Sequence, residues 1–99
     1  MIHTLHTTED LIYAYVVFRT VDINGKAKNE GLYIYVENIW ISNSYRGGEV
    51  LKELIEHIDQ HPECKNAKWV YWQREKYNDR VSKPYERSRF IKEMAYGKR

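Results

Sequence analysis

LYIYVENIWISNSYRGGEVLKELIEHI, residues 32–58, joins a β-rich segment to an amphipathic segment through a loop with two adjacent glycines. From Leu32 to Ile41, β-branched and aromatic side chains alternate, which predicts a central strand covered on both faces. After the glycines, apolar side chains recur at spacings of one, three and four residues, which predicts a helix over Glu49–His61. Pro62 marks the end of this helix. The apolar positions are Val50, Leu51, Leu54, Ile55 and Ile58.

The flanking segments extend this pair into a mixed sheet. β-rich stretches predict further strands at Leu11–Val21, Ala67–Gln73 and Phe90–Tyr96. Asn24-Gly25 is typical of a hairpin turn, and the polar segment 74–89 predicts a second helix. The predicted fold is a mixed α/β domain over residues 1–99, with a parallel strand–helix–strand crossover flanked by antiparallel strands.

Composition favours a cytoplasmic globular chain. Apolar residues make up 42% of the sequence, and no apolar run approaches the roughly 20 residues that span a bilayer. The first ten residues do not have the pattern of a secretory signal. A single cysteine, Cys64, cannot form an internal disulfide, which agrees with a reducing compartment.

Two features of the composition point to partners. Nine tyrosines and three tryptophans predict an aromatic-rich sheet with a dimer contact, and stacking on nucleic acid bases is the alternative. Residues 1–64 hold five Lys/Arg against ten Asp/Glu, whereas residues 65–99 hold eleven against four. The carboxy-terminal third therefore has a basic surface that favours phosphate groups, in a nucleotide cofactor or in nucleic acid.

The order of strand, polar link, Arg-Gly-Gly and amphipathic helix resembles the GNAT family of N-acetyltransferases. In that family a loop of the form Gln/Arg-x-x-Gly-x-Gly/Ala holds the pyrophosphate of acetyl-coenzyme A at the start of a helix. A second similarity lies downstream, where the family often shows Asn, a small residue, Tyr and Gly-Phe at fixed offsets. The residues at those offsets are Asn78, Val81, Tyr85, Arg89 and Phe90.

The resemblance implies an acetyl-coenzyme A site and transfer of the acetyl group to an amine. It assigns Tyr85 as the acid near the departing sulfur and Glu37 as a carboxylate that acts directly or through water. Because a proline deep in a helix removes a hydrogen bond, Pro84 predicts that the helix carrying Tyr85 either is short, beginning near Ser82, or is kinked. The implied cofactor-binding residues are Ile41, Arg46, Gly47, Gly48, Glu49, Val50 and Asn78.

The loop and the amino terminus depart from the family pattern. Glu49 and Leu51 stand where the family has small residues, and a carboxylate at Glu49 repels a pyrophosphate. Weak binding of acetyl-coenzyme A, or binding only with a partner, is the expectation. The residues before Leu11 show no counterpart of the family's first strand and two helices. The chain thus resembles a truncated GNAT domain, in which a second copy or another protein covers the missing helices.

Two other classes of protein stay open as alternatives. The basic residues of the carboxy-terminal third are interleaved with aromatic residues, a mixture used on single-stranded nucleic acid. A non-catalytic scaffold for protein interaction would also explain the altered loop. A metal site is not predicted, because Pro62 ends the helix before the spacing of His57, His61 and Cys64 can place three ligands on one face.

Overall fold

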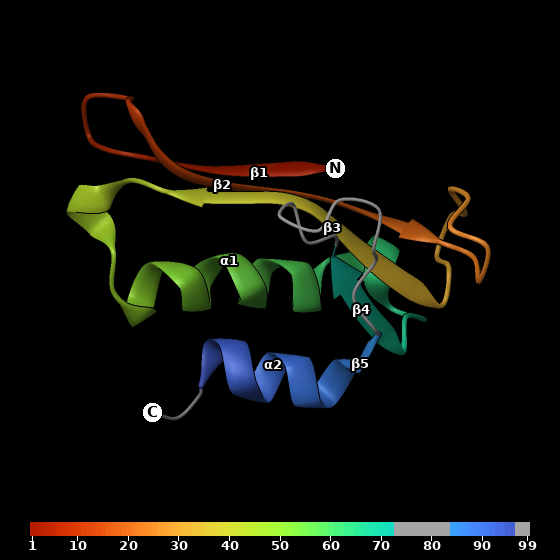
Figure 1. Cartoon of the computed structure of the whole chain (residues 1–99). Helices are drawn as coiled ribbons and strands as arrows, with labels where there is room; N and C mark the ends of the chain where they lie inside the picture. Colours follow the sequence, from red (N-terminus) through yellow and green to blue (C-terminus); the bar gives the residue numbers. More distant parts are fainter. Residues whose placement is uncertain (73–83, 97–99) are drawn as a thin grey trace.

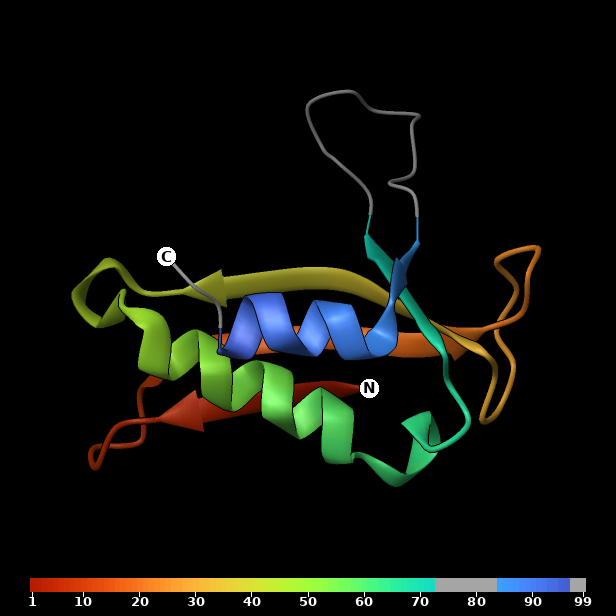
Figure 2. The same ribbon diagram turned by 90° about the horizontal axis from the view of Figure 1, so that it is seen from below.

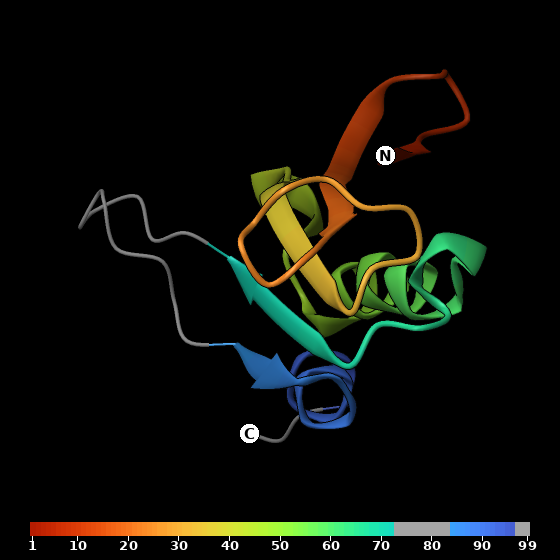
Figure 3. The ribbon, with the colours of Figure 1, turned by 90° about the vertical axis from the view of Figure 1, so that its right-hand side faces the viewer.

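The computed structural model describes residues 1–72 and 84–96, which form a mixed α+β fold with a five-stranded sheet and two α-helices (Figure 1). The strands lie in the order β1-β2-β3-β4-β5, with β3 and β4 parallel and the other neighbours antiparallel. β1 and β5 form the two edges of this twisted sheet (Figure 3). In chain order the elements are β1 (Ile2–His6), β2 (Ile12–Val21), β3 (Tyr33–Ile41), the 3-10 turn η1 (Asn43–Tyr45), α1 (Gly48–Gln60), the 3-10 turn η2 (Pro62–Cys64), β4 (Trp69–Trp72), β5 (Tyr85–Glu86) and α2 (Arg87–Ala95).

Both helices lie on one face of the sheet, where they enclose the core (Figures 1 and 2). α1 packs against β2 and α2, and α2 also contacts β4 and β5. Full burial of a Leu, Ile or Phe side chain contributes about 1.5–3 kcal/mol, so this layer supplies most of the stability. The largest buried side chains of the core are Val16, Phe18, Ile34, Leu54, Ile55, Ile58 and Val70.

The central prediction is confirmed. β3, α1 and β4 form a parallel crossover, and β3 pairs directly with β4, with Ile34 opposite Val70. The apolar positions predicted for the helix are those that α1 turns toward the sheet: Leu54, Ile55 and Ile58 are buried. None of the helices in the described part of the chain is long and apolar enough to cross a membrane.

A β-bulge interrupts β3 at Glu37. Val17 of β2 pairs with Asn38 and Phe18 pairs with Val36, so Glu37 is an extra residue in β3. Because successive strand residues point to opposite faces, the extra residue changes which face the rest of the strand presents. Ile39 and Ile41 consequently share the helix-covered face with Val36.

The predicted carboxy-terminal strand at Phe90–Tyr96 is wrong, because these residues belong to α2. Phe90, Ile91 and Met94 have the one, three and four spacing of a helix, and they pack against the core from one side. On the solvent side, Arg89 Nε donates to Glu93 one turn away at 3.0 Å, which supports the helix further.

Two other elements differ from the sequence prediction. Tyr85 lies in β5, opposite Val70 of β4, and not in a helix that begins near Ser82. The segment 73–83, including Gln73 and Ser82, lies outside the described residues. At the other end of the chain, the residues before Leu11 supply β1, which pairs with β2 along Ile2–His6.

Candidate functional site

A groove of about 830 Å³ lies along the second half of β3, on the helix side of the sheet. Among residues 1–72 and 84–96, β4 pairs with Tyr33–Val36 of β3, and residues 38–41 pair with β2 alone. The helices α1 and α2, which lie side by side in front of the sheet in Figure 2, supply the other walls. The groove is lined by Tyr35, Val36, Glu37, Asn38, Ile39, Leu51, Ile55, Trp72, Phe90 and Met94.

This groove combines an apolar wall with a strand edge. Along residues 38–41, the β3 backbone groups that point away from β2 have no strand partner among residues 1–72 and 84–96. Such an edge forms hydrogen bonds with any extended molecule that carries amide groups. Leu51, Trp72 and Met94 provide apolar contact area beside it. The arrangement is suited to a ligand that is long, narrow and partly amide in character.

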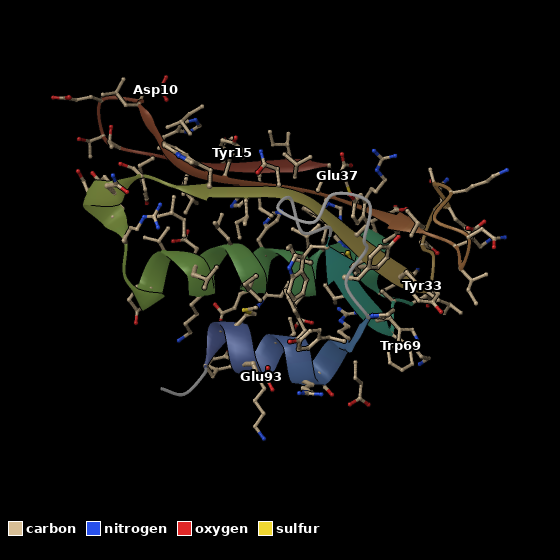
Figure 4. The ribbon with its side chains drawn as sticks, viewed as in Figure 1. Asp10, Tyr15, Tyr33, Glu37, Trp69 and Glu93 are labelled. Carbon is tan, nitrogen blue, oxygen red and sulfur yellow. The ribbon has the colours of Figure 1, made fainter. Side chains whose placement is uncertain are left out.

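Glu37 sits at the bulge, at the rim of the groove, and its carboxylate is held by an arginine. Arg19 Nε of β2 donates to Glu37 Oε2 at 2.6 Å. This hydrogen bond lowers the pKa of Glu37, and partial burial opposes the effect only in part. In Figure 4 the Glu37 side chain points away from the helices, to the other side of the sheet. Glu37 is therefore a weaker proton acceptor than a free glutamate.

The loop predicted to hold the cofactor forms the amino-terminal end of α1. Ile41 ends β3 and packs against the core, and Arg46 follows η1 in an extended conformation. Gly47 is the residue before the helix, and no side chain caps the helix there. Gly48 begins α1, Glu49 lies exposed in its first turn, and Val50 packs against the core.

This loop leaves space for an anion but carries opposed charges. A side chain added at Gly47 or Gly48 would meet no atom within 4 Å. Uncapped N–H groups and the helix dipole favour an anion at this position. Arg46 adds to that attraction and Glu49 opposes it, and neither forms an ion pair with the residues that the structure describes.

Tyr85 stacks against the wall of the groove. Its ring lies 5.3 Å from that of Trp72 and 6.5 Å from that of Phe90, measured between centroids. The Arg89 guanidinium covers the same ring at 5.2 Å from its centre. Tyr85 thus supports two groove-lining residues without lining the groove itself. Asn78, the other downstream residue of the predicted site, lies outside the described residues.

Three of the four histidines, His3, His57 and His61, are brought together as a packed cluster. His3 of β1 stacks on His57 of α1 with ring centroids 3.6 Å apart, and His61 lies 5.7 Å from His57. Burial lowers the pKa of His57, and His3 and His61 lower it further. Cys64 is buried, which raises the pKa of its thiol to about 11. Among the described residues, no three His, Cys, Asp or Glu side chains are placed to hold a metal ion.

Several of the basic residues in the carboxy-terminal third are used within the fold. Lys65 lies 3.7 Å from Glu30, and Arg89 pairs with Glu93. Arg87 is largely buried and bonds to Asp59 and to three backbone carbonyls. Two other residues of the predicted basic surface are described, Lys68 and Lys92. The rest of that surface lies in the segment 73–83, outside the described residues: Arg74, Lys76, Arg80 and Lys83. Nucleic acid binding stays a prediction.

Sequence reasoning missed the apolar wall of the groove. Phe90 and Met94 were assigned to a strand, although their spacing of four residues is a helical signal. Trp72 lies in β4, within the strand predicted at Ala67–Gln73, but no local pattern indicates that its ring faces Phe90 across the groove. No protein-family model matches the chain, and no curated protein is significantly similar to it. Its function must therefore be inferred from the geometry.

Proposed function

We propose that this chain is an acetyltransferase-like domain that binds the pantetheine arm of acetyl-coenzyme A in the β3 groove. The observation that carries the proposal is the groove of about 830 Å³ beside β3, which brings residues 37–39 of that strand together with Leu51, Trp72 and Met94. A pantetheine arm contains two amides joined by short alkyl chains. Its amides match the backbone groups of residues 38–41 that have no strand partner among the described residues, and its alkyl parts match Leu51, Trp72 and Met94.

The route of the chain after β3 supports a place for the phosphates. β3 leads through η1 directly to the uncapped start of α1, and Leu51, near that start, already lines the groove. A ligand in the groove therefore extends toward Arg46, Gly47 and Gly48. The Glu49 carboxylate repels phosphate at this end of the groove. Because Glu49 is exposed to water, the repulsion is limited to about 1–2 kcal/mol, which corresponds to roughly tenfold in Kd.

The proposed reaction is transfer of the acetyl group to an amine, with Tyr85 as acid and Glu37 as the carboxylate near the amine. Arg19 lowers the pKa of Glu37, and Tyr85 stands behind Trp72. We therefore expect binding of acetyl-coenzyme A to be measurable more readily than turnover.

Calorimetric titration of the full chain with acetyl-coenzyme A tests the proposal. Leu51→Trp fills the groove and should weaken binding at least about tenfold. Leu32→Trp makes the same exchange at a half-exposed position outside the groove and is the matched control. Equal affinity in these two variants would remove the groove as the binding site.

A second pair of variants tests the loop. Glu49→Gly and Glu49→Gln should both tighten binding, whereas Glu53→Gln removes the same charge at an exposed position one turn further along α1 and should not. Release of free thiol from acetyl-coenzyme A in the presence of small amines then measures transfer. Absence of binding in both the wild type and Glu49→Gly at millimolar cofactor would overturn the proposed function.

A further inference from the structure

The sheet face opposite the helices carries a row of aromatic side chains. We call it the aromatic face and define it by Tyr15 of β2, Tyr33, Tyr35 and Trp40 of β3, and Tyr71 of β4, which the strand register places on one side. The rings contact each other: Tyr15 lies 5.7 Å from Trp40, and Tyr35 lies 5.0 Å from Tyr71. Figure 4 shows Tyr15 on the side of the sheet away from α1 and α2.

This face is accessible and continues into apolar edge residues. Trp40 is 41% exposed, and no helix in the described part of the chain covers the face. Toward β1 the same side carries Ile2, which is 64% exposed, and Ile12, which is 50% exposed. Exposed aromatic and aliphatic side chains gathered on one surface are typical of protein interfaces.

The charges on the aromatic face balance each other. β2, β3 and β4 direct two charged side chains to this side, Arg19 and Glu37, and these lie side by side at 2.6 Å. A surface with one cation next to one anion is complementary to a copy of itself turned by a two-fold rotation. A polyanion needs a net positive surface, and a strongly acidic or basic protein needs the opposite net charge.

We propose that two copies of this chain associate through their aromatic faces about a two-fold axis, with Arg19 of each copy facing Glu37 of the other. The rings of Tyr15 and Trp40 form the apolar part of the contact. This proposal does not depend on acetyl-coenzyme A, because the rings of Tyr15 and Trp40 lie outside the β3 groove, although Tyr35 and Glu37 border both surfaces.

Sedimentation of the full chain over micromolar to submillimolar concentrations tests the proposal. The wild type should form dimers, and Trp40→Lys should raise the dimer dissociation constant at least about tenfold. Tyr96→Lys places the same charge in the helix layer, where Tyr96 is 59% exposed, and should leave dimerisation unchanged. Circular dichroism and urea unfolding establish that each variant is folded.

A charge exchange tests the two-fold arrangement itself. Arg19→Glu alone places two acids opposite each other, and Glu37→Arg alone places two bases opposite each other, so each variant should be monomeric. An equimolar mixture of the two should form heterodimers, because both cross-contacts then join opposite charges. A monomeric wild type, dimers that survive Trp40→Lys, or a mixture that stays monomeric would each overturn the proposal.

Discussion

Arg87 is expected to be required for stability, in contrast to the neighbouring Arg89. The Arg87 side chain is 19% exposed and joins the end of α1, the following loop and α2. Its guanidinium donates to the Asp59 carboxylate at 3.0 Å, to the Asp59 carbonyl at 2.6 Å, to the Ala67 carbonyl at 3.0 Å and to the Cys64 carbonyl. It therefore satisfies an acceptor near the end of α1, where helical carbonyls lack partners within the helix.

Arg87→Met should lower the free energy of unfolding by about 3 kcal/mol. Each of three carbonyls loses about 1 kcal/mol of hydrogen bonding, and the Asp59 carboxylate adds little because it is partly exposed. For a domain of this size, the urea midpoint falls by roughly 2 M. Arg87→Lys keeps the charge but cannot reach four acceptors at once, so it should lose most of the same amount.

Arg89→Met is the control for this prediction, because Arg89 lies two residues along the same helix and its side chain is mostly exposed. Its urea midpoint should stay close to that of the wild type. Urea unfolding followed by circular dichroism measures all three variants. Equal midpoints for Arg87→Met and Arg89→Met would refute the reasoning, because the hydrogen bonds of Arg87 would then contribute no more than an exposed ion pair.

Three other groups give predictions of their own. Cys64 should react with a thiol reagent only after unfolding, since burial raises its pKa to about 11; rapid labelling of the native chain would contradict this. The pKa of His57 is lowered from 6.5, so the unfolded chain binds a proton more readily and stability should fall as the pH drops below 6.5. His57→Gln should flatten that part of the stability profile, and an unchanged profile would assign the decline to other groups. Arg19→Met should raise the pKa of Glu37 toward 4.5, measured by an NMR titration of its carboxyl group, and an unaltered value would show that Arg19 is not the cause.

The β3–α1–β4 unit was predictable because each of its signals is local. Alternating β-branched and aromatic residues define β3, and the spacing of Leu54, Ile55 and Ile58 defines α1. The loop between them places Gly47 and Gly48 at the start of the helix, as expected. These features depend only on neighbours within a few residues along the chain.

The parts of the fold and of the groove that the sequence does not predict depend on contacts between segments that are distant along the chain. β5 has two residues, and it forms because Tyr85 pairs with Val70 and Glu86 pairs with Trp69 of β4. The groove results from the packing of α1 and α2 beside β3 and Trp72, which no local pattern encodes. Likewise, the hydrogen bond from Arg19 to Glu37 joins residues eighteen positions apart, so no local pattern indicates that the carboxylate has a cationic partner.

The bulge at Glu37 makes this one position of β3 tolerant of loss as well as of exchange. Because Val36 pairs with Phe18 and Asn38 pairs with Val17, deleting Glu37 would join Val36 to Asn38 in a regular strand. Asn38 and Trp40 would still point away from the helices, and Ile39 and Ile41 would still face them. A deletion or insertion between residues 38 and 41 would instead reverse the two sides of the strand beyond it. In a set of homologous sequences, we therefore expect gaps in β3 at position 37 and not between residues 38 and 41.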